Sequence, residues 1–259
     1  MKSHMAAAFL SLFISTFADA GIMLNSPATY TQDFDTLALS GSSSVTPADW
    51  EFAETGTAAN INYTAGTGSG NVGDTYSFGL SGSPDRALGE LTSGPLNSTF
   101  GVSFTNAGTT AIQSLTFNYS GEQWRIGNTG AARTDRLDFQ YSLNATSLTA
   151  GTWINLDALD FLSPITTASS VGALNGNLAA NRSNLDSTLT GLNINSGESI
   201  WIRWQAVDIG GSDDGLAIDN FSLTAQFAAV PEPSSIAFII ASGLCTAIYQ
   251  KRRQPRERR

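Results

Sequence analysis

The sequence predicts an all-β protein, an antiparallel β-sandwich of jelly-roll type, with one helical segment at each end of the chain. Apolar and polar residues alternate in short runs through the middle of the chain, as expected for strands with one buried and one solvated face. Gly, Ser, Thr and Asn are frequent between these runs, and charged residues make up only 14% of the chain, which favours strands joined by turns. No part of 21–228 shows the three-to-four spacing of an amphipathic helix.

The stretch 1–20 has the features of a secretory signal peptide. Lys2 precedes an apolar run at 5–17, and the triplet 18–20, Ala-Asp-Ala, has the small-x-small form of a cleavage site. The alternative is a buried N-terminal helix. We expect cleavage after residue 20, which would leave 21–228 as an exported β-sandwich domain.

In the first part of this domain the candidate strands are 30–37, 49–54, 61–63 and 75–78. A cluster of glycines separates the last two of them: Gly66, Gly68, Gly70 and Gly73. No helical pattern follows the cluster and no lysine lies near it, so a hairpin or bulge is favoured over a nucleotide-binding loop.

The middle of the chain has the clearest alternation, in the runs 100–104, 115–120 and 137–142. In the first run Phe100, Val102 and Phe104 are apolar and the residues between them are Gly and Ser. Burying three such side chains contributes roughly 5 to 8 kcal/mol before the loss of chain entropy. A few strands of this kind are therefore enough to hold two packed sheets together.

The later part of the domain is predicted to contain a strand at 152–161 with a kink near Asp157, followed by a polar surface loop at 163–191. Two closing strands are expected at 199–208 and 216–227.

In the last of these runs the apolar positions change parity. They pass from Leu216 and Ile218 to Phe221 and Leu223. Because side chains on a strand alternate strictly, this change predicts a β-bulge at Asp219 or Asn220.

Residues 229–259 form a different kind of segment. Pro231, Glu232 and Pro233 come first, and an apolar run follows at 236–249. As a helix this run would cover roughly 21 Å, against a hydrocarbon core of about 30 Å, so it is a short transmembrane helix. A basic cluster that would keep the C-terminus in the cytoplasm ends the chain: Lys251, Arg252, Arg253, Arg256, Arg258 and Arg259.

The composition of the domain excludes several kinds of chemistry. The single histidine is His4 and the single cysteine is Cys245, so 21–228 has neither residue, and it has no lysine. Disulfides, thiolate or imidazole metal sites, Ser-His-Asp triads and Schiff-base chemistry are therefore excluded within it. The formal net charge of −9 disfavours a nucleic-acid partner, because affinity for nucleic acid comes largely from cationic contacts to phosphate.

The Pro-Glu-Pro triplet at 231–233, the apolar run and the terminal arginines together resemble the PEP-CTERM sorting signal of bacterial exported proteins. This resemblance implies that the protein is the substrate of an exosortase, a membrane enzyme that cuts near the triplet. It also implies transient anchoring in the inner membrane, followed by release to the cell surface or extracellular matrix. The alternative is a plain single-span anchor.

The domain itself resembles a β-jelly-roll module of secreted bacterial proteins, in the runs 73–79, 85–89, 136–142 and 214–221. The last run is also similar to the closing strand of adhesion and carbohydrate-binding jelly rolls. The resemblance implies a fold and no defined activity.

Aspartates predict a structural calcium site. Asp33 and Asp35 lie on the first strand, and further aspartates surround the Gly-Gly turn before the last strand. Ca²⁺ takes six to eight oxygen ligands, and the first and last strands of a jelly roll are often neighbours. The candidate ligands are Asp33, Asp35, Asp213, Asp214 and Asp219. The alternative is a set of solvated turn aspartates.

Trp124 and Arg125 predict a glycan platform in which a flat ring and a guanidinium hold a sugar, with Arg133 and Arg136 nearby. The alternative is that Trp124 caps the core and that the arginines pair with Asp135 and Asp138.

Catalysis would require two facing carboxylates, about 5 to 5.5 Å or 6.5 to 9.5 Å apart in glycoside hydrolases. Glu54, Glu90, Glu122 and Asp160 are the candidates. The favoured function is non-catalytic: an exported surface or matrix protein. The alternatives are a carbohydrate-binding module that binds polysaccharide and, more remotely, a carboxylate-dependent glycosidase.

Overall fold

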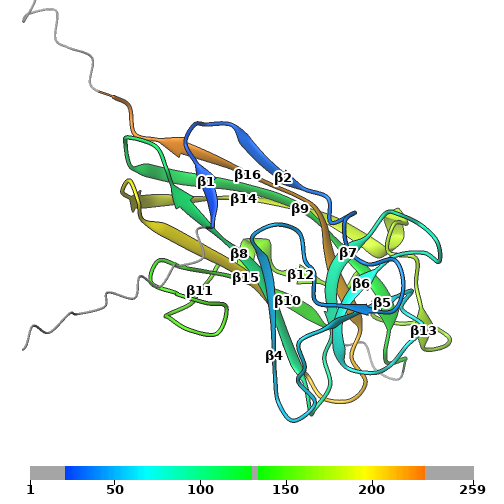
Figure 1. Cartoon of the computed structure of the whole chain (residues 1–259). Coiled ribbons are helices and arrows are strands. Elements are labelled where there is room, and N and C mark those ends of the chain that lie inside the picture. Colours follow the sequence, from blue (N-terminus) through cyan, green and yellow to red (C-terminus); the bar gives the residue numbers. More distant parts are fainter. Residues whose placement is uncertain (1–20, 130–133, 231–259) are drawn as a thin grey trace, which may run out of the picture. The chain divides into compact units, whose positions relative to one another are not determined.

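The computed structural model describes residues 21–129 and 134–230, and its regular structure consists of strands and two short 3-10 turns. The turns are η1 (Asp157–Leu159) and η2 (Ala179–Asn181). The strands form two sheets that pack face to face (Figure 1), so the prediction of an antiparallel β-sandwich of jelly-roll type is confirmed. No described helix is long and apolar enough to cross a membrane. The predicted signal peptide and sorting motif lie outside the described residues.

The first sheet is built around β8 and β15. Its order is β1 (Ile22–Leu24), β8 (Asn97–Asn106), β15 (Ser199–Ala206), β10 (Arg136–Ser142) and β11 (Ile154–Asn155), with β4 (Trp50–Thr55) paired to β8 and β12 (Phe161–Leu162) paired to β10. All pairs in it are antiparallel except β1 with β8.

The second sheet is built around β9 and β16. Its order is β13 (Gly172–Ala173), β9 (Ile112–Ile126), β16 (Gly215–Phe227), β7 (Ala87–Leu91), β6 (Asp74–Phe78), β5 (Tyr63–Gly66) and β3 (Ser42–Ser43), with β14 (Arg182–Ile194) paired to β9 and β2 (Thr29–Gln32) paired to β16. The β5–β6 pair is parallel and the others are antiparallel.

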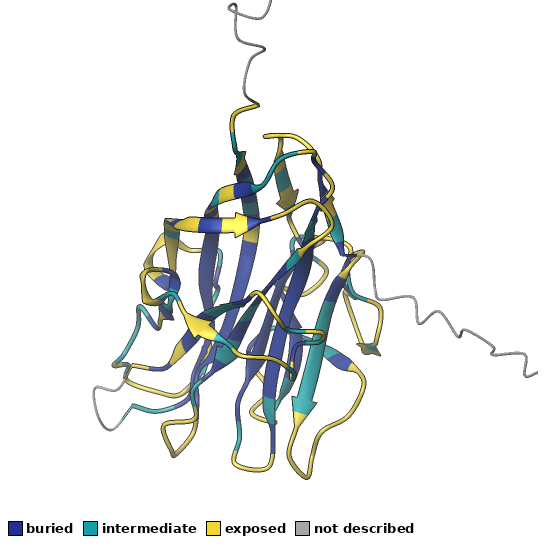
Figure 2. Ribbon diagram, turned by 90° about the vertical axis from the view of Figure 1, so that its left-hand side faces the viewer, coloured by how far each residue is buried: buried dark blue, intermediate teal, exposed yellow. Residues whose placement is uncertain are grey.

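The main core lies between the sheets and is centred on Trp204. The inward residues of the alternating runs meet there, and the buried strand segments run through the middle of the sandwich in Figure 2. Ring centroids lie within 6.0 Å of the Trp204 ring for five aromatic side chains: Trp50, Phe100, Tyr119, Phe139 and Phe221. The pairs with Trp50 and Phe100 are stacked and the other three are edge-to-face, and aromatic pairs in both arrangements add stability beyond their buried area.

A second, smaller apolar cluster lies on the outer face of the second sheet. Leu216 and Ile218 belong to the main core, so Ala217 between them points to the opposite face. The cluster consists of Tyr76, Phe78, Ala87, Leu91, Trp124 and Ala217. The sheet is therefore buried on both faces where β7, β9 and β16 lie side by side.

Three sequence predictions can be compared with the strands. The bulge is confirmed, because the β16–β9 register shifts between Asp219 and Ser222, and Asn220 has φ +51°. The kink near Asp157 is confirmed as the turn η1.

The prediction of a surface loop over 163–191 is wrong in its second half, where β14 pairs with β9 over most of its length. Its outward residues Asn184, Asp186, Thr188 and Thr190 are polar because that face of β14 is exposed to solvent. Only one of its faces needs apolar side chains.

Candidate functional site

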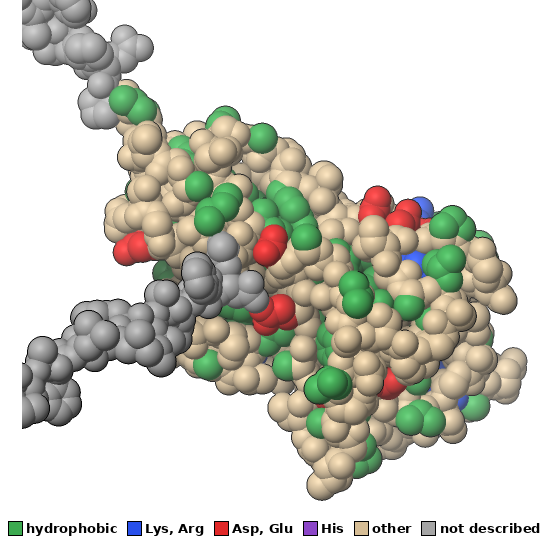
Figure 3. Space-filling view, viewed as in Figure 1, with side chains coloured by type: hydrophobic (Ala, Val, Ile, Leu, Met, Phe, Trp, Pro, Cys, Tyr) green, Lys and Arg blue, Asp and Glu red, His purple; other side chains and the backbone are tan. Residues whose placement is uncertain are grey.

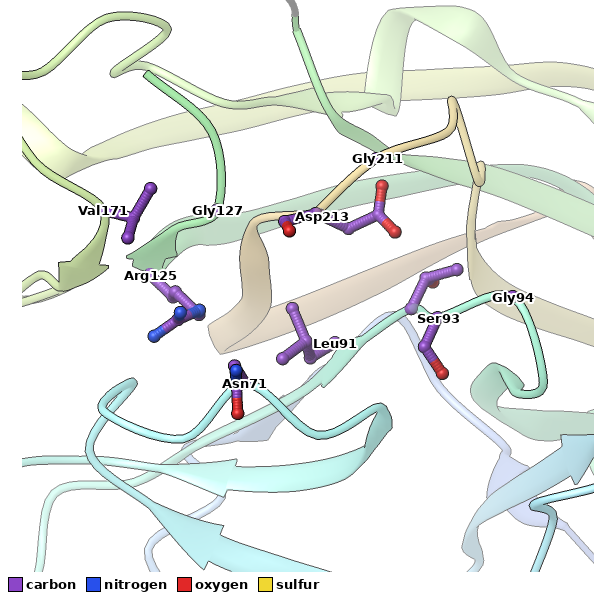
Figure 4. Close-up of a pocket in the computed structure, with 11 residues that line it drawn as sticks. Asn71, Leu91, Ser93, Gly94, Arg125, Gly127, Val171, Gly211 and Asp213 are labelled. Atoms are coloured by element: carbon purple, nitrogen blue, oxygen red, sulfur yellow. The ribbon is translucent and has the colours of Figure 1, made fainter. Parts of the chain in front are cut away.

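A cavity of about 390 Å³ opens at the end of the second sheet, where β7 and β9 end and β16 begins (Figure 4). We call it the Arg125 cavity. Its walls come from the loop before β6, the turn after β7, the end of β9 and the turn before β16. It is lined by Asn71, Leu91, Thr92, Ser93, Gly94, Arg125, Gly127, Val171, Gly211, Ser212 and Asp213.

A β-bulge in β9 separates Trp124 from Arg125. Gly215 of β16 pairs with Arg125 and the next residue, Leu216, pairs with Gln123, so Trp124 is the extra residue. The Trp124 side chain enters the smaller apolar cluster, whereas Arg125 lines the cavity. Two neighbouring residues thus have separate surroundings.

Arg125 is held in place by the glycine-rich loop before β6. Its side chain is 8% exposed, and Nη1 donates to the carbonyl oxygens of Gly68 (3.1 Å) and Ser69 (3.3 Å). Gly68 has φ +77°, and a Cβ there would lie 1.8 Å from the Trp124 carbonyl oxygen. Only glycine lets the loop approach β9 this closely.

Asp214 holds one wall of the cavity in place through hydrogen bonds. Its carboxylate accepts hydrogen bonds from Gly127 N (2.8 Å), Gln123 Nε2 (2.7 Å) and Ser163 Oγ (2.7 Å). Its own N–H donates to Asp135 Oδ2 (2.5 Å). Asp214 therefore joins the end of β9 to the segment after β12. These hydrogen bonds compensate for the burial of its carboxylate, which indicates a structural role.

Glu90 is buried near this wall. Thr92 Oγ1 donates to its Oε2 (2.6 Å). Burial, together with the negative charges of Asp213 and Asp135, raises the pKa of Glu90 to about 8.

The five aspartates predicted to bind calcium lie in two separate places. β2 pairs with β16 as expected, so Asp33 and Asp35, which follow β2, lie near Asp219, whereas Asp213 and Asp214 lie at the Arg125 cavity. Within 21–129 and 134–230 no group of three or more Asp, Glu, His or Cys side chains is arranged to hold a metal ion.

The structure adds Glu122 and Asp85 to the acidic group near Asp219. Burial, together with the negative charges of Glu122, Asp85 and Asp35, raises the pKa of Asp219 to about 8. Burial also raises the pKa of Glu122 to about 7. Sequence spacing could not find this group, because its members come from different strands and loops.

Glu122 is the most unusual member of the group. It is 1% exposed, and its Oε2 accepts a hydrogen bond from Trp124 Nε1 (2.9 Å). Its Oε1 is buried and has no hydrogen-bond partner among the described residues. Such an atom loses its hydration without compensation.

The predicted glycan platform is wrong for Trp124. The side chain is 1% exposed and stacks on Phe78 at 6.1 Å between ring centroids, so its ring offers no surface to a sugar. Its burial in an apolar cluster fits the alternative of a core side chain. Arg136 pairs with Asp138 at 2.6 Å, also as in the alternative, and Arg133 lies outside the described residues.

The tryptophan that does reach the surface is Trp153, which precedes β11. The Arg203 guanidinium lies over its ring, with Cζ 4.0 Å from the centroid. Arg203 Nε in turn donates to Gln140 Oε1 (2.7 Å). Sequence spacing did not predict this pair, because Trp153 precedes β11 and Arg203 lies on β15, much later in the chain.

The four acidic residues considered for catalysis lie in separate surroundings. Glu54 on β4 accepts hydrogen bonds from Thr75 and Asn60, and Asp160 accepts one from Phe139 N (2.9 Å). Glu90 on β7 and Glu122 on β9 are buried.

Comparisons with known proteins show a broad resemblance of fold. No protein-family model and no curated protein sequence matches the chain. Among solved structures, the chain is similar to the K3 cleaved adhesin domain of Lys-gingipain from Porphyromonas gingivalis W83, with 10% identity, a TM-score of 0.39, and coverage of 69% of this chain and 93% of that one.

It is also similar to TmCBM61, solved in complex with β-1,4-galactotriose, with 8% identity, a TM-score of 0.34, and coverage of 68% and 88%. The xylan-binding module CBM15 matches with 14% identity, a TM-score of 0.32, and coverage of 69% and 98%. Similarity at this level carries no argument about a ligand.

Proposed function

We propose that the protein is an exported, non-catalytic component of the cell surface or matrix that binds polysaccharide in the Arg125 cavity. The observation that carries this proposal is a nearly buried arginine in a cavity, with only one of its three nitrogens bonded to described residues. Sugar hydroxyls both donate and accept hydrogen bonds. Arg125 supplies donors for them, and Asn71, Ser93 and Ser212 supply donors and acceptors on the other walls.

Glycan-array screening of the purified full chain tests this proposal. We expect binding to at least one polysaccharide class, and we expect Arg125→Ala to remove it. Arg136→Ala is the matched control, because Arg136 is exposed, pairs with Asp138 and lies outside the cavity. A blank array at high protein concentration would contradict the proposal.

The non-catalytic role is supported by the lack of His, Cys and Lys in 21–228 and by the separate surroundings of the four candidate acids. We expect no release of reducing ends from any polysaccharide that binds. Measurable hydrolysis that Glu90→Gln abolishes would instead support a glycosidase.

Export is supported by the sequence features of 1–20 and 229–259. We propose that an exosortase-type enzyme recognises Pro231, Glu232 and Pro233 while the apolar run holds the protein in the inner membrane. Mass spectrometry of the protein from its native host should find Gly21 at the N-terminus and loss of the basic cluster. Cytosolic protein with Met1 and Arg259 intact would contradict this.

Calcium binding near Asp219 is a second proposal. The buried Oε1 of Glu122, which has no hydrogen-bond partner among the described residues, supports it, because a cation would compensate both this oxygen and the neighbouring Asp219. We expect CaCl₂ to raise the melting temperature of the full chain and EDTA to lower it. Glu122→Gln should remove the calcium effect, and an unchanged melting temperature in both solutions would contradict the proposal.

A further inference from the structure

We propose that the Arg125 cavity binds the carboxylate of an acidic sugar, a uronate residue of a polysaccharide, through the Nε and Nη2 edge of Arg125. This inference rests on the proposed function and specifies the class of its ligand.

Arg125 differs from the buried Arg86 and the partly buried Arg203 in what it bonds. Arg203 uses Nε, Nη1 and Nη2, which donate to Gln140, Leu148 and Gln205. Arg86 uses Nε and Nη2, which donate to Ser77 and Gly66. Arg125 uses Nη1 alone.

Arg125 also has no counter-ion among the described residues, where the recorded ion pair is that of Arg136 with Asp138. A cation that is 8% exposed has lost most of its hydration. Burial of a charge is unfavourable unless a partner of opposite charge and hydrogen bonds compensate for it. An anionic ligand would supply both.

The free edge of the guanidinium has the geometry of a carboxylate receptor. Nη1 is held by the carbonyl oxygens of Gly68 and Ser69. The N–H groups of Nε and Nη2, which point outward along one edge of the planar guanidinium, have no partners among the described residues. Two parallel N–H donors on one edge match the two oxygens of a carboxylate. Because the carbonyls already hold the plane, little side-chain freedom is lost on binding.

The position of Arg125 sets the orientation of the ligand. Figure 4 shows the Arg125 guanidinium beside Asn71, whereas the Asp213 carboxylate is turned toward Gly211. A uronate carboxylate would be attracted to Arg125. The hydroxyl groups of the sugar then face Ser93 and Ser212 on the remaining walls.

The charge of the whole molecule makes this inference easy to test. The chain has a formal net charge of −9, and Figure 3 shows acidic side chains scattered over the visible face with few basic ones. At long range such a molecule repels a polyanion. Binding to a polyuronate would therefore have to come from a local site and not from general attraction.

The experiment compares polygalacturonate with the same polymer after chemical reduction of its carboxylates to primary alcohols. Affinity of the full chain is measured by isothermal titration calorimetry in calcium-free buffer, with alginate and its carboxyl-reduced form as a second pair. We expect reduction to weaken binding about thirtyfold or more, the effect typical of removing one partner of a buried, hydrogen-bonded charge pair. Arg125→Gln should cause a similar loss, Arg125→Lys should recover only part of the affinity, and Arg136→Gln should have no effect.

The outcomes separate this inference from the proposed function. Equal binding of native and reduced polymers, or binding of neutral polysaccharides alone, would overturn the uronate assignment and leave polysaccharide binding intact. Failure of the folded wild-type chain to bind any polymer would overturn both. Thermal melts of the variants report folding, and the comparison of polymers on wild-type protein does not depend on any variant.

Discussion

At the scale of single residues, buried carboxyl groups make stability depend on pH. Burial raises the pKa of Glu122 to about 7 and those of Glu90 and Asp219 to about 8. A carboxyl with a raised pKa binds its proton more tightly in the folded than in the unfolded chain. The stability that these groups contribute is therefore fully present below about pH 4 and is lost as the pH rises toward about 8.

Glu122→Gln isolates this effect, because glutamine keeps an oxygen for Trp124 Nε1 and cannot ionise. We expect the variant to match wild type in melting temperature at about pH 3.5, below the ordinary pKa of a glutamate. At pH 8.5 it should be more stable by on the order of 1 to 3 kcal/mol. Asp186→Asn, on the exposed side of β14, is the control for removing a carboxylate from the surface. A Glu122→Gln difference that is the same at both pH values would contradict the prediction.

Trp124 and Trp153 show what residue type can and cannot predict. Trp124 lies between Gln123 and Arg125 and Trp153 between Thr152 and Ile154, so the local pattern did not show which of the two is buried. Trp124 is buried because a bulge and the glycine-rich loop create a second apolar cluster on the outer face of the sheet. That cluster depends on contacts between residues far apart in the chain, which a local pattern does not contain.

At the scale of elements, the loop before β6 sets the position of Arg125. Gly68→Ala would place a Cβ against the Trp124 carbonyl in a conformation that alanine rarely adopts. We expect the loop to shift, its carbonyls to release Nη1, and polysaccharide affinity to fall together with the melting temperature. Gly82→Ala is a control for positive φ alone, because its Cβ would meet nothing within 4 Å. Affinity that survives Gly68→Ala would contradict the anchoring role.

The bulge in β16 gives a second prediction at this scale. Asn220 has φ +51°, a region that asparagine and glycine tolerate better than other residues. Asn220→Val should lower the free energy of unfolding by about 1 to 2 kcal/mol in urea titrations, whereas Asn220→Gly should stay close to wild type. Equal stability of the two variants would mean that the bulge relaxes.

Sequence alternation was sufficient to find β8, β10, β15 and β16, and the parity change located the bulge. It failed for β14, because an edge strand that needs apolar side chains on one face only resembles a polar loop. Leu185 and Leu189 were its apolar signals, and the intervening Ser and Thr residues obscured them.

At the scale of the whole molecule, the two sheets depend on one aromatic centre. Trp204→Ala should cost about 3 to 5 kcal/mol, because it leaves a large cavity among five rings. Trp153→Ala, which removes a surface cation–π contact, should cost about 1 kcal/mol. Thermal melts that rank the two variants in the opposite order would contradict this view of the core.

The all-β class was predictable because it depends on a pattern repeated along the entire chain. The Arg125 cavity was not, although Arg125 and Asp213 were both candidates for separate sites. They meet because β9 and β16 are paired and because a loop from before β6 crosses their ends. Which residues lie together in such a cavity depends on the pairing of strands that are distant in the chain. Amino-acid composition does not predict that pairing.

The place of β16 in the second sheet also affects when this chain can fold. This final strand pairs with β2 from the beginning of the chain and with β7 and β9 from its middle. A nascent chain that has not yet acquired residues 215–227 lacks the strand that joins these parts, so the second sheet is completed only after the last strand has been synthesised. In the export that we propose, the chain would therefore be able to leave the cytoplasm before its final strand closes the sheet.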